Sequence, residues 1–430
     1  MNLYVQALTI NKVRHLHDLV IELSPISETG VKHLILTGRN GCGKTSLLEA
    51  LRDYLEGIPK DTLQYLNRWR GEARELESRI ERIKSQLSIT NVAGVRISVP
   101  DDNTLRDQMA KYIKNLNEIK VKLAEYENVD VRIPGLSEVV SRYNEGTFIL
   151  AYFVAKRANA VAITNTFQAF DFQQRYNLTD SAADLFVQHL VNMKARRSFA
   201  RDENNLVEAT RIDEWFESFL KALRDLFDDS SLELLFDKEN FNFKIQLGDR
   251  REPFDFNSMS DGYSSVMNIV SELVMRMEKK SSRVYDLPGI VLIDEIETHL
   301  HIELQKKILP FLTSFFPKVQ FIVSSHSPFV LNSIRDAVVF DLENRIKVED
   351  LSGYSADGIV KGYFQLDEYS RELKERIAKY RELAGKSALD DNEQEQFEDL
   401  DDYFSSLPMF MSPELQAEVR QIRIVRNERS

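Results

Sequence analysis

Eight consecutive residues near the start of the chain have the types and spacing of a phosphate-binding loop. Gly38-Arg39-Asn40-Gly41-Cys42-Gly43-Lys44-Thr45 fits the pattern G-x-x-x-x-G-K-[ST], and Ser46 follows it. The glycines let backbone N–H groups curl around a phosphate chain, and a helix that starts there directs its positive end at the anion. We expect Lys44 to bridge the β- and γ-phosphates of a nucleotide and the Thr45 hydroxyl to ligate Mg²⁺.

Two acidic residues, Asp294 and Glu295, directly follow a short apolar run, Ile290–Ile293. A buried strand delivers such residues to its carboxyl edge, where the ligands of a parallel sheet bind. We expect Asp294 to hold the Mg²⁺ ion and Glu295 to polarise an attacking water molecule. An apolar strand that ends in acids is common without any function, so this interpretation depends on the phosphate loop in the same chain.

Two further segments carry groups that are suited to contact a phosphate. His326 follows an apolar run, Val319–Ser324, and could donate a hydrogen bond to a γ-phosphate; the alternative is an ordinary core or surface histidine. Ser260 and Gly262 open an expected helix, where a hydroxyl and free N–H groups form a second anion site. An ordinary capped helix start would have residues of the same types, because serine and aspartate are favoured caps.

The elements that must position these groups are short strands and helices. Strands are predicted before the loop at Leu3–Ile10, Leu19–Leu23 and His33–Thr37, and after it at Phe148–Val154, Phe241–Leu247, Ile290–Asp294, Val319–Ser324 and Ala337–Leu342. Helices are expected over Thr45–Leu55, through most of 181–227 and in the polar segment 361–430. Short apolar strands separated by helices are typical of a buried parallel sheet, so the predicted fold class is α/β.

Two segments after position 65 have a different period. In each of them apolar residues recur three and four positions apart between charged ones, which is the heptad pattern of coiled coils. A segment with Gly94 and Pro100 separates them, so we expect an antiparallel helical hairpin roughly 30 Å long. Two ordinary amphipathic core helices are the alternative. The first run comprises Leu66, Trp69, Ala73, Leu76, Ile80, Ile83 and Leu87, and the second Leu105, Met109, Tyr112, Leu116, Ile119, Leu123 and Tyr126.

The composition limits the class of protein. The chain has 430 residues, 43% of them hydrophobic and 29% charged, which suffices for a large core and roughly three domains. A net charge of −12 argues against a free-standing basic DNA-binding module. The single cysteine, Cys42, excludes an intramolecular disulfide and fits a cytoplasmic setting. No signal-peptide pattern is apparent, and the longest apolar run, Phe148–Ala155, is too short to span a bilayer, so no membrane partner is expected.

In this order the motifs resemble those of ABC-class ATPase heads, in the branch that contains the SMC, Rad50, RecF and OLD proteins. The resemblance covers about residues 1–60 and 145–345. It implies that Gly38–Thr45 is the Walker A loop and that Asp294-Glu295 is the Walker B pair with the catalytic glutamate. It also implies that Ser260-Asp261-Gly262 is the signature motif and His326 the switch histidine, while Glu297–His301 resembles the D-loop of the OLD-like group.

The resemblance implies a particular assembly and architecture. Two heads would close head-to-tail around two ATP molecules, each lying between Lys44 of one protomer and Ser260 and Gly262 of the other. The expected fold is an ABC/SMC-like P-loop ATPase head with an inserted antiparallel coiled-coil hairpin and a helical C-terminal tail. The corresponding divisions are a first ATPase part over 1–60, the hairpin over 61–130, the rest of the ATPase domain over 131–345 and an acidic helical region over 346–430.

The sequence also departs from the family pattern. Asp261 stands where transporters usually have glycine, and Tyr263 stands where they often have glutamine. Gln168 and Arg157 are both candidates for the Q-loop residue, and the pattern does not choose between them. Asp399-Leu400-Asp401 is formally a D-x-D pair, but it lies in an acidic amphipathic stretch and is interpreted as solvated helix. Because no nuclease or metal-cluster pattern is found, no nuclease activity of the chain itself is expected.

These features lead to competing hypotheses of function. The overall build resembles the ATPase subunits of bacterial antiphage systems, of the Septu (PtuA), PARIS and retron kinds, which implies an ATP-gated sensor and scaffold for a partner nuclease such as an HNH protein. The alternative is a DNA-repair ATPase like RecF or Rad50, and a transporter ATPase is disfavoured by the heptad insertion. Basic residues could track DNA phosphates, although interspersed glutamates favour a solvated surface: Arg68, Arg70, Arg74, Arg79, Arg82, Lys84, Lys111, Lys114, Lys120, Lys122, Lys194, Arg196, Arg197 and Arg201.

Overall fold

The computed structural model describes residues 3–23, 30–89, 102–124, 126–157, 172–248, 252–278, 285–360, 371–386, 388–406 and 413–429. It separates into two compact units, Met1–Ala356 and Asp357–Ser430. None of the helices described in these ranges is both long and apolar enough to cross a lipid bilayer. Gln168, one of the two Q-loop candidates, lies outside the described residues.

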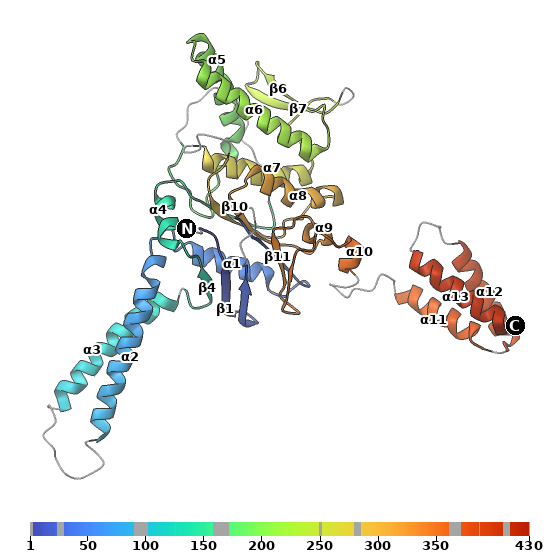
Figure 1. Ribbon diagram of the computed structural model, residues 1–430, viewed down its shortest axis with the longest axis horizontal. Helices are drawn as coiled ribbons and strands as arrows, with labels where there is room; N and C mark the ends of the chain where they lie inside the picture. Colours follow the sequence, from blue (N-terminus) through green and yellow to red (C-terminus); the bar gives the residue numbers. More distant parts are fainter. Residues whose placement is uncertain are drawn as a thin grey trace. The chain divides into compact units, whose positions relative to one another are not determined.

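A sheet of six strands forms the centre of the first unit, in the order β12-β11-β3-β10-β9-β5 (Figure 1). All neighbouring strands run parallel except β11 and β12. The predicted parallel sheet is therefore confirmed, and β12 is an antiparallel edge strand that the sequence did not indicate. The strands are β3 (His33–Thr37), β5 (Ile149–Phe153), β9 (Gly289–Ile293), β10 (Val319–Ser324), β11 (Ala337–Asp341) and β12 (Ile346–Glu349).

Helices cover the two faces of this sheet, which explains why its central strands are buried throughout and mostly apolar. Helix α1 (Lys44–Leu55) packs on β9 and β10 and, on its other side, on a small second sheet in the order β2-β1-β4. Figure 1 shows α7 (Asp261–Met277) and α8 (Ile302–Phe315) on the opposite side of the central sheet from α1. The strands of the second sheet are β1 (Ala7–Val13), β2 (Leu16–Glu22) and β4 (Val129–Arg132).

The segment 181–227, which was expected to be mostly helical, contains two helices, α5 (Phe186–Asp202) and α6 (Leu206–Phe227), which pack on each other. A third small sheet, β6-β7-β8, follows this pair, and only its central strand was predicted. The third sheet consists of β6 (Glu233–Asp237), β7 (Asn242–Gln246) and β8 (Phe254–Asp255). Shorter helices elsewhere in the chain are α4 (Leu136–Asn144), η2 (Ala183–Leu185), α9 (Pro328–Leu331) and α10 (Ala356–Gly358).

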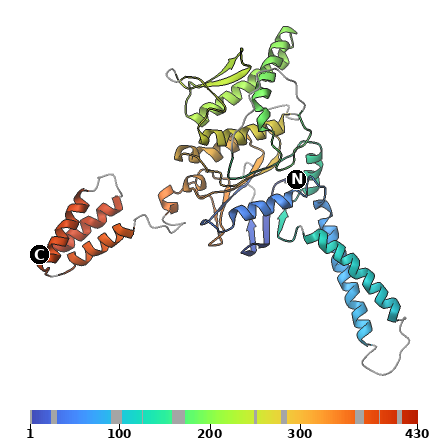
Figure 2. The ribbon, with the colours of Figure 1, turned by 180° about the vertical axis from the view of Figure 1, so that it is seen from behind.

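The two heptad runs form helices α2 (Leu66–Ile89) and α3 (Asp102–Ala124), after a short turn η1 (Leu63–Tyr65). The helices lie side by side in both views (Figures 1 and 2). They run antiparallel, because Trp69 near the start of α2 lies under the ammonium of Lys122 near the end of α3, 5.5 Å from it. The apolar contact consists of residues of the predicted seams: Ala73, Leu76, Ile80, Met109, Tyr112, Leu116, Ile119 and Leu123.

The second unit contains three helices with a core of their own. These are α11 (Arg371–Ala384), α12 (Asp391–Ser406) and α13 (Pro413–Arg429). Tyr380 is fully buried at the centre of this core, and its ring stacks on Phe397 with centroids 4.9 Å apart. The D-x-D pair lies within α12, where Asp401 forms an ion pair with Arg423 at 2.6 Å. Asp401 is thus a structural partner of α13, which agrees with the helical interpretation of that segment.

A buried ion pair ties α7 to the central sheet. Arg276 and Glu272 are 7% and 5% exposed, and their side chains are 2.6 Å apart. Arg276 also donates hydrogen bonds to the carbonyl oxygens of Leu150, Asn177 and Asp180, while Glu272 accepts from backbone N–H groups of Ala182 and Ala183. Removal of one partner of such a pair leaves the other charge buried without compensation.

We therefore expect Arg276→Met to destabilise the first unit by about 3–5 kcal/mol. Urea unfolding followed by tryptophan fluorescence measures this, because both tryptophans, Trp69 and Trp215, lie in that unit. Arg68→Met is the matched control, since Arg68 forms an exposed pair with Glu72 one turn away on the same helix. An unfolding midpoint of Arg276→Met equal to that of the control would contradict the assigned role of the buried pair.

Candidate functional site

The carboxyl ends of β3, β10 and β9 bring three of the predicted motifs to one edge of the central sheet. The loop Gly38–Thr45 follows β3, the Asp294-Glu295 pair follows β9, and His326 follows β10, which lies between the other two strands. Backbone hydrogen bonds tie these ends together, from Ser325 N–H to Leu36 and from Ile296 N–H to Ser324. Since β10 lies between β3 and β9, groups that follow β3 and groups that follow β9 can face each other across the end of β10.

The loop has the backbone that a phosphate cradle needs. Gly38, Gly41 and Gly43 all have positive φ angles, of 126°, 83° and 100°. A Cβ on Gly38 would lie 2.8 Å from the Cys42 sulfur, so the turn is too tight there for any side chain. At Gly41 no atom lies within 4 Å of a built Cβ, so the loop is open at this point. These features, and the helix α1 that starts at Lys44, fit a bound phosphate chain.

The Lys44 side chain points back into the loop. It is 5% exposed, and its ammonium donates hydrogen bonds to the carbonyl oxygens of Gly38 at 2.9 Å and Arg39 at 3.2 Å. The next residue, Thr45, is exposed, so its hydroxyl is accessible to a ligand. An ammonium held in the cradle and an accessible hydroxyl beside it are the groups that a magnesium nucleotide requires.

Distant residues that the sequence did not reveal also hold the loop. Asp341 and Glu343, at the end of β11, flank it: Glu343 accepts a hydrogen bond from Arg39 N–H at 3.3 Å and forms an ion pair with the Arg39 guanidinium at 3.6 Å. On the other side, the ring nitrogen Nε2 of His15 lies 3.0 Å from the carbonyl oxygen of Cys42. Arg39 and Glu343 are too far apart in sequence for any local pattern to connect them.

The two acids differ in burial and in partners. Asp294 is 3% exposed, and its Oδ1 accepts a hydrogen bond from the Ser324 hydroxyl at 2.6 Å. Glu295 is half-buried, and its Oε2 accepts from the Thr298 hydroxyl at 3.3 Å. The Ser324 oxygen also accepts from Glu295 N–H at 2.7 Å. Ser324 therefore orients both acids, although the sequence pattern indicated it only as the last residue of a strand.

His326 contacts both the loop and the segment that follows the acidic pair. Its Nδ1 lies 3.5 Å from the Lys44 ammonium nitrogen, and its backbone N–H donates to the carboxylate of Glu297. Burial, and then the positive charge of Lys44, lower the pKa of His326 below its usual value. A lowered pKa favours the neutral ring at pH 7, and a neutral imidazole has one N–H group that can donate a hydrogen bond.

The predicted signature residues lie at the start of α7. Ser260 and Asp261 are exposed, and the Ser260 side chain makes no capping hydrogen bond to its helix. Gly262 is buried against the loop after β9, and a Cβ there would lie 2.9 Å from the carbonyl oxygen of His299. Glycine is therefore required for the close approach of α7 to the segment Glu297–His301. In that segment His299 and His301 are exposed, and His301 precedes α8.

Arg157, the Q-loop candidate within the described residues, lies at the same edge. Its guanidinium donates to the carbonyl oxygens of Asp294 at 2.9 Å and Glu295 at 3.0 Å, and to the hydroxyl of Ser265 at 3.0 Å. The sequence showed only that an arginine follows a predicted strand. The structure connects this arginine with both the acidic pair and helix α7.

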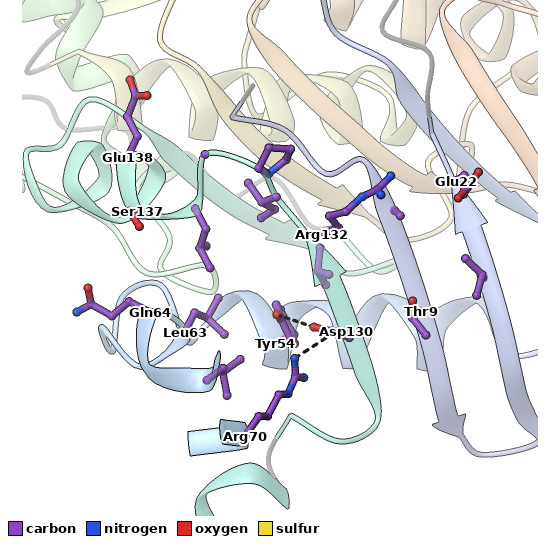
Figure 3. Close-up of a pocket in the computed structure, with 18 residues that line it drawn as sticks. Thr9, Glu22, Tyr54, Leu63, Gln64, Arg70, Asp130, Arg132, Ser137 and Glu138 are labelled. Carbon is purple, nitrogen blue, oxygen red and sulfur yellow. Dashed lines mark hydrogen bonds and ion pairs between the residues drawn. The ribbon is translucent and has the colours of Figure 1, made fainter. Parts of the chain in front are cut away.

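A separate hollow of about 740 Å³ lies away from the loop, between the second sheet and the start of α2 (Figure 3). At its wall Asp130 accepts hydrogen bonds from the Tyr54 hydroxyl and from Arg70, each at 3.2 Å. These three residues belong to β4, α1 and α2, as Figure 3 shows. Asp130 thereby connects the start of α2 with α1, the helix that begins at the phosphate loop.

Many of the basic residues considered for phosphate contacts have acidic partners. The pairs formed among residues of α2 and α3 place both charges on exposed side chains, where each contributes little to stability. This favours the solvated-surface interpretation over a continuous phosphate-binding track. The pairs that basic residues of this set form, on the hairpin and elsewhere, are Arg68–Glu72, Arg70–Asp130, Arg79–Glu75, Lys84–Glu81, Lys120–Glu77, Arg196–Glu208, Arg197–Asp213 and Arg201–Asp213.

Comparison with known proteins gives one family and several relatives. The family described as "AAA domain, putative AbiEii toxin, Type IV TA system" matches residues 159–332. The Septu protein PtuA of Bacillus mycoides is 22% identical over 416 residues, which are 94% of this chain and 50% of that protein. The Retron Vc95 probable ATPase of Vibrio cholerae is 22% identical over 371 residues, 73% of this chain and 70% of the relative. The Retron Ec83 probable ATPase of Escherichia coli is 28% identical over 37% of this chain and 30% of its own length.

Among solved structures, an SMC head bound to the C-terminal winged-helix domain of ScpA covers 81% of this chain with 13% identity and a TM-score of 0.37. The chain is thus similar in sequence to the Septu and retron ATPases, and its loop and sheet-edge site have the residue types of a P-loop nucleotide site. The chain spans about half the length of the Septu relative.

Proposed function

We propose that the chain binds ATP with Mg²⁺ at the loop Gly38–Ser46 and hydrolyses it. The observation that carries the proposal is the direct connection of three separately predicted motifs at one sheet edge. Lys44 lies 3.5 Å from His326, and Ser324, two residues before His326, is hydrogen-bonded to Asp294. Phosphate release from ATP by the purified chain, with and without Mg²⁺, tests the activity.

The residues of the site have distinct roles in this reaction. Lys44 and the loop N–H groups would hold the phosphates, and Thr45 and Asp294 are the residues that would hold Mg²⁺, which neutralises phosphate charge when bound. Glu295 would take the proton of the attacking water as a general base. His326, with its neutral ring, would donate a hydrogen bond to the γ-phosphate.

We further propose that each nucleotide is shared by two copies of the chain. Ser260 is exposed and uncapped at the start of α7, so its hydroxyl is available to a group outside its own helix. In a head-to-tail dimer Ser260 and Gly262 of one copy would contact the nucleotide held by Lys44 of the other. Each site would then contain the loop of one copy and the α7 start of the other.

A mixing experiment tests the shared site. Lys44→Ala and Ser260→Arg should each be inactive as pure proteins, the first because the loop loses its ammonium and the second because the α7 start is blocked. A mixture of the two should regain part of the activity, since mixed dimers contain one site with an intact loop and an intact α7 start. No regain of activity, with mixed dimers shown to form, would contradict the shared site.

We propose that this ATPase is a subunit of an antiphage defence complex and acts as an ATP-gated sensor and scaffold for a partner nuclease. The proposal is supported by the Septu and retron relatives and by the additional parts of the chain. Those parts are the helical pair α2–α3, proposed as the coiled-coil insertion, and the second unit. Helix α12 of that unit exposes acidic side chains, including Asp391, Glu395 and Glu398, that suit a basic partner.

Affinity purification of the chain from its native host, followed by mass spectrometry and native mass measurement, tests this proposal. A stoichiometric nuclease or other effector would support the scaffold role. The second candidate, a DNA-repair ATPase, predicts instead ATP-dependent DNA binding that weakens steeply with salt and no effector protein. The acid–base pairs on the helical hairpin favour the first candidate.

A further inference from the structure

The backbone at the proposed general base is held in an unusual conformation. Glu295 has a φ angle of 43°, in the left-handed region that residues other than glycine seldom adopt. A residue keeps such a conformation only where its surroundings over-determine it. Its N–H donates to the Ser324 hydroxyl at 2.7 Å, which fixes one side of the residue.

Arg157 fixes the other side. Its guanidinium donates to three consecutive carbonyl oxygens, those of Asp294 at 2.9 Å, Glu295 at 3.0 Å and Ile296 at 3.3 Å. A planar guanidinium with five N–H donors can serve several fixed acceptors at once, which a lysine ammonium cannot do in the same geometry. The three carbonyl groups of the strained turn therefore all point toward the guanidinium of Arg157.

The same guanidinium also reaches a third element. Its Nε donates to the hydroxyl of Ser265 at 3.0 Å, and Ser265 is buried on the first turns of α7, five residues after Ser260. Arg157 itself follows β5 and donates to the carbonyl oxygen of Val154 at 3.2 Å. One side chain therefore connects the end of β5, the turn that carries the general base, and the helix that begins at the proposed second anion site.

The arginine is charged when it makes these contacts. Burial lowers its pKa to about 10, and the carboxylates of Glu297, Asp294 and Glu295 act in the opposite direction. A pKa near 10 leaves the guanidinium protonated at neutral pH. Glu297 is part of the same arrangement: one of its oxygens accepts the N–H of His326, and its Oε2 is buried without a hydrogen-bond partner in the described part of the chain.

We propose that Arg157 is a positioning residue, which holds Glu295 in its active conformation and links that conformation to helix α7. The inference rests on the proposed role of Glu295 as the general base. A nucleotide that binds at the start of α7 would affect the position of Ser265. Arg157 would transmit this effect to the turn at Glu295. In this role Arg157 acts through the backbone of Glu295.

A double-mutant cycle tests this inference. Arg157→Gln should lower kcat at saturating ATP by about 10- to 100-fold, the range expected for lost hydrogen bonds to a charged group, while the Kd for ATP stays within about twofold. The kcat of Arg157→Lys should lie between those of the wild-type chain and Arg157→Gln. In the Glu295→Gln background, Arg157→Gln should have no further effect, because its action depends on the carboxylate.

A second readout needs no nucleotide. Hydrogen exchange of the backbone amides of Glu295 and Ile296 should become faster in Arg157→Gln than in the wild-type chain, because the turn loses its anchor. Ser265→Ala should leave this exchange nearly unchanged and lower kcat by less than Arg157→Gln does, since the carbonyl contacts remain. If Arg157→Gln does not fold, Arg157→Lys and Ser265→Ala are measured in the same way.

The outcomes separate this inference from the proposed function. If Glu295→Gln alone leaves turnover unchanged, the assignment of the general base is wrong. If Glu295→Gln slows turnover but Arg157→Gln changes neither kcat nor exchange, only the positioning role is wrong. An equal loss of kcat on Arg157→Gln in both backgrounds would also overturn it, because Arg157 would then act independently of Glu295.

Discussion

Lys44→Ala should abolish detectable nucleotide binding, with the Kd for Mg-ATP raised by about 100-fold or more, the order found when one partner of a buried charge contact is truncated. The ammonium of Lys44 is the positive charge inside the loop, and it is held there by the carbonyl oxygens of Gly38 and Arg39. A bound phosphate chain would take the place of these carbonyl contacts. Isothermal titration calorimetry with ATP measures the loss directly.

The control for this experiment is Lys60→Ala. Lys60 is an exposed lysine shortly after α1, paired with Glu56 one turn earlier, so its loss removes one positive charge without touching the loop. It should bind ATP like the wild-type chain. Unchanged ATP affinity in Lys44→Ala would show that the loop is not the nucleotide site, and the functional account would fail at its first step.

Glu295→Gln should bind ATP normally and hydrolyse it about 10²- to 10⁴-fold more slowly, the range for loss of a general base. Glutamine preserves the size of the side chain and can still accept the hydrogen bond from Thr298, but it cannot take a proton from water. Binding is retained because Lys44 and the loop are intact. Single-turnover hydrolysis at saturating Mg-ATP measures the chemical step apart from product release.

Glu303→Gln is the matched control for this substitution. Glu303 lies on α8, eight residues further along the chain, with an exposed side chain paired to Lys306. It should hydrolyse ATP at the wild-type rate. Wild-type turnover in Glu295→Gln would place the general base at another residue and remove the reason for the acidic pair at the end of β9.

The parts of the molecule that local patterns specify were predicted well. The strand His33–Thr37, the glycine loop and helix α1 are adjacent in sequence, and the structure has them in the expected order and nearly at the expected bounds. Strand β10 has the predicted bounds Val319–Ser324, and α2 and α3 contact each other through residues of the two heptad seams. Each of these predictions depends on the spacing of residues within one element.

The parts that depend on contacts between distant segments were not predicted. Strand β4 was missed because four residues, Val129–Arg132, become a strand only by pairing with β1. The first strand was placed too early, since the turn after β1 is made by Arg14 with a positive φ angle and not by glycine. For the same reason, the contacts of Arg157 with the turn at Glu295 could not be read from the sequence.

The most direct test of the account is the native mass of the Glu295→Gln chain in the presence and absence of Mg-ATP. We predict a species of twice the chain mass that carries two nucleotides with Mg-ATP, because binding is intact while hydrolysis, which would release the pair, is slowed. Adding Lys44→Ala to the same chain should abolish this species. A chain that stays monomeric and free of nucleotide under these conditions would contradict the proposed ATP site and its shared arrangement.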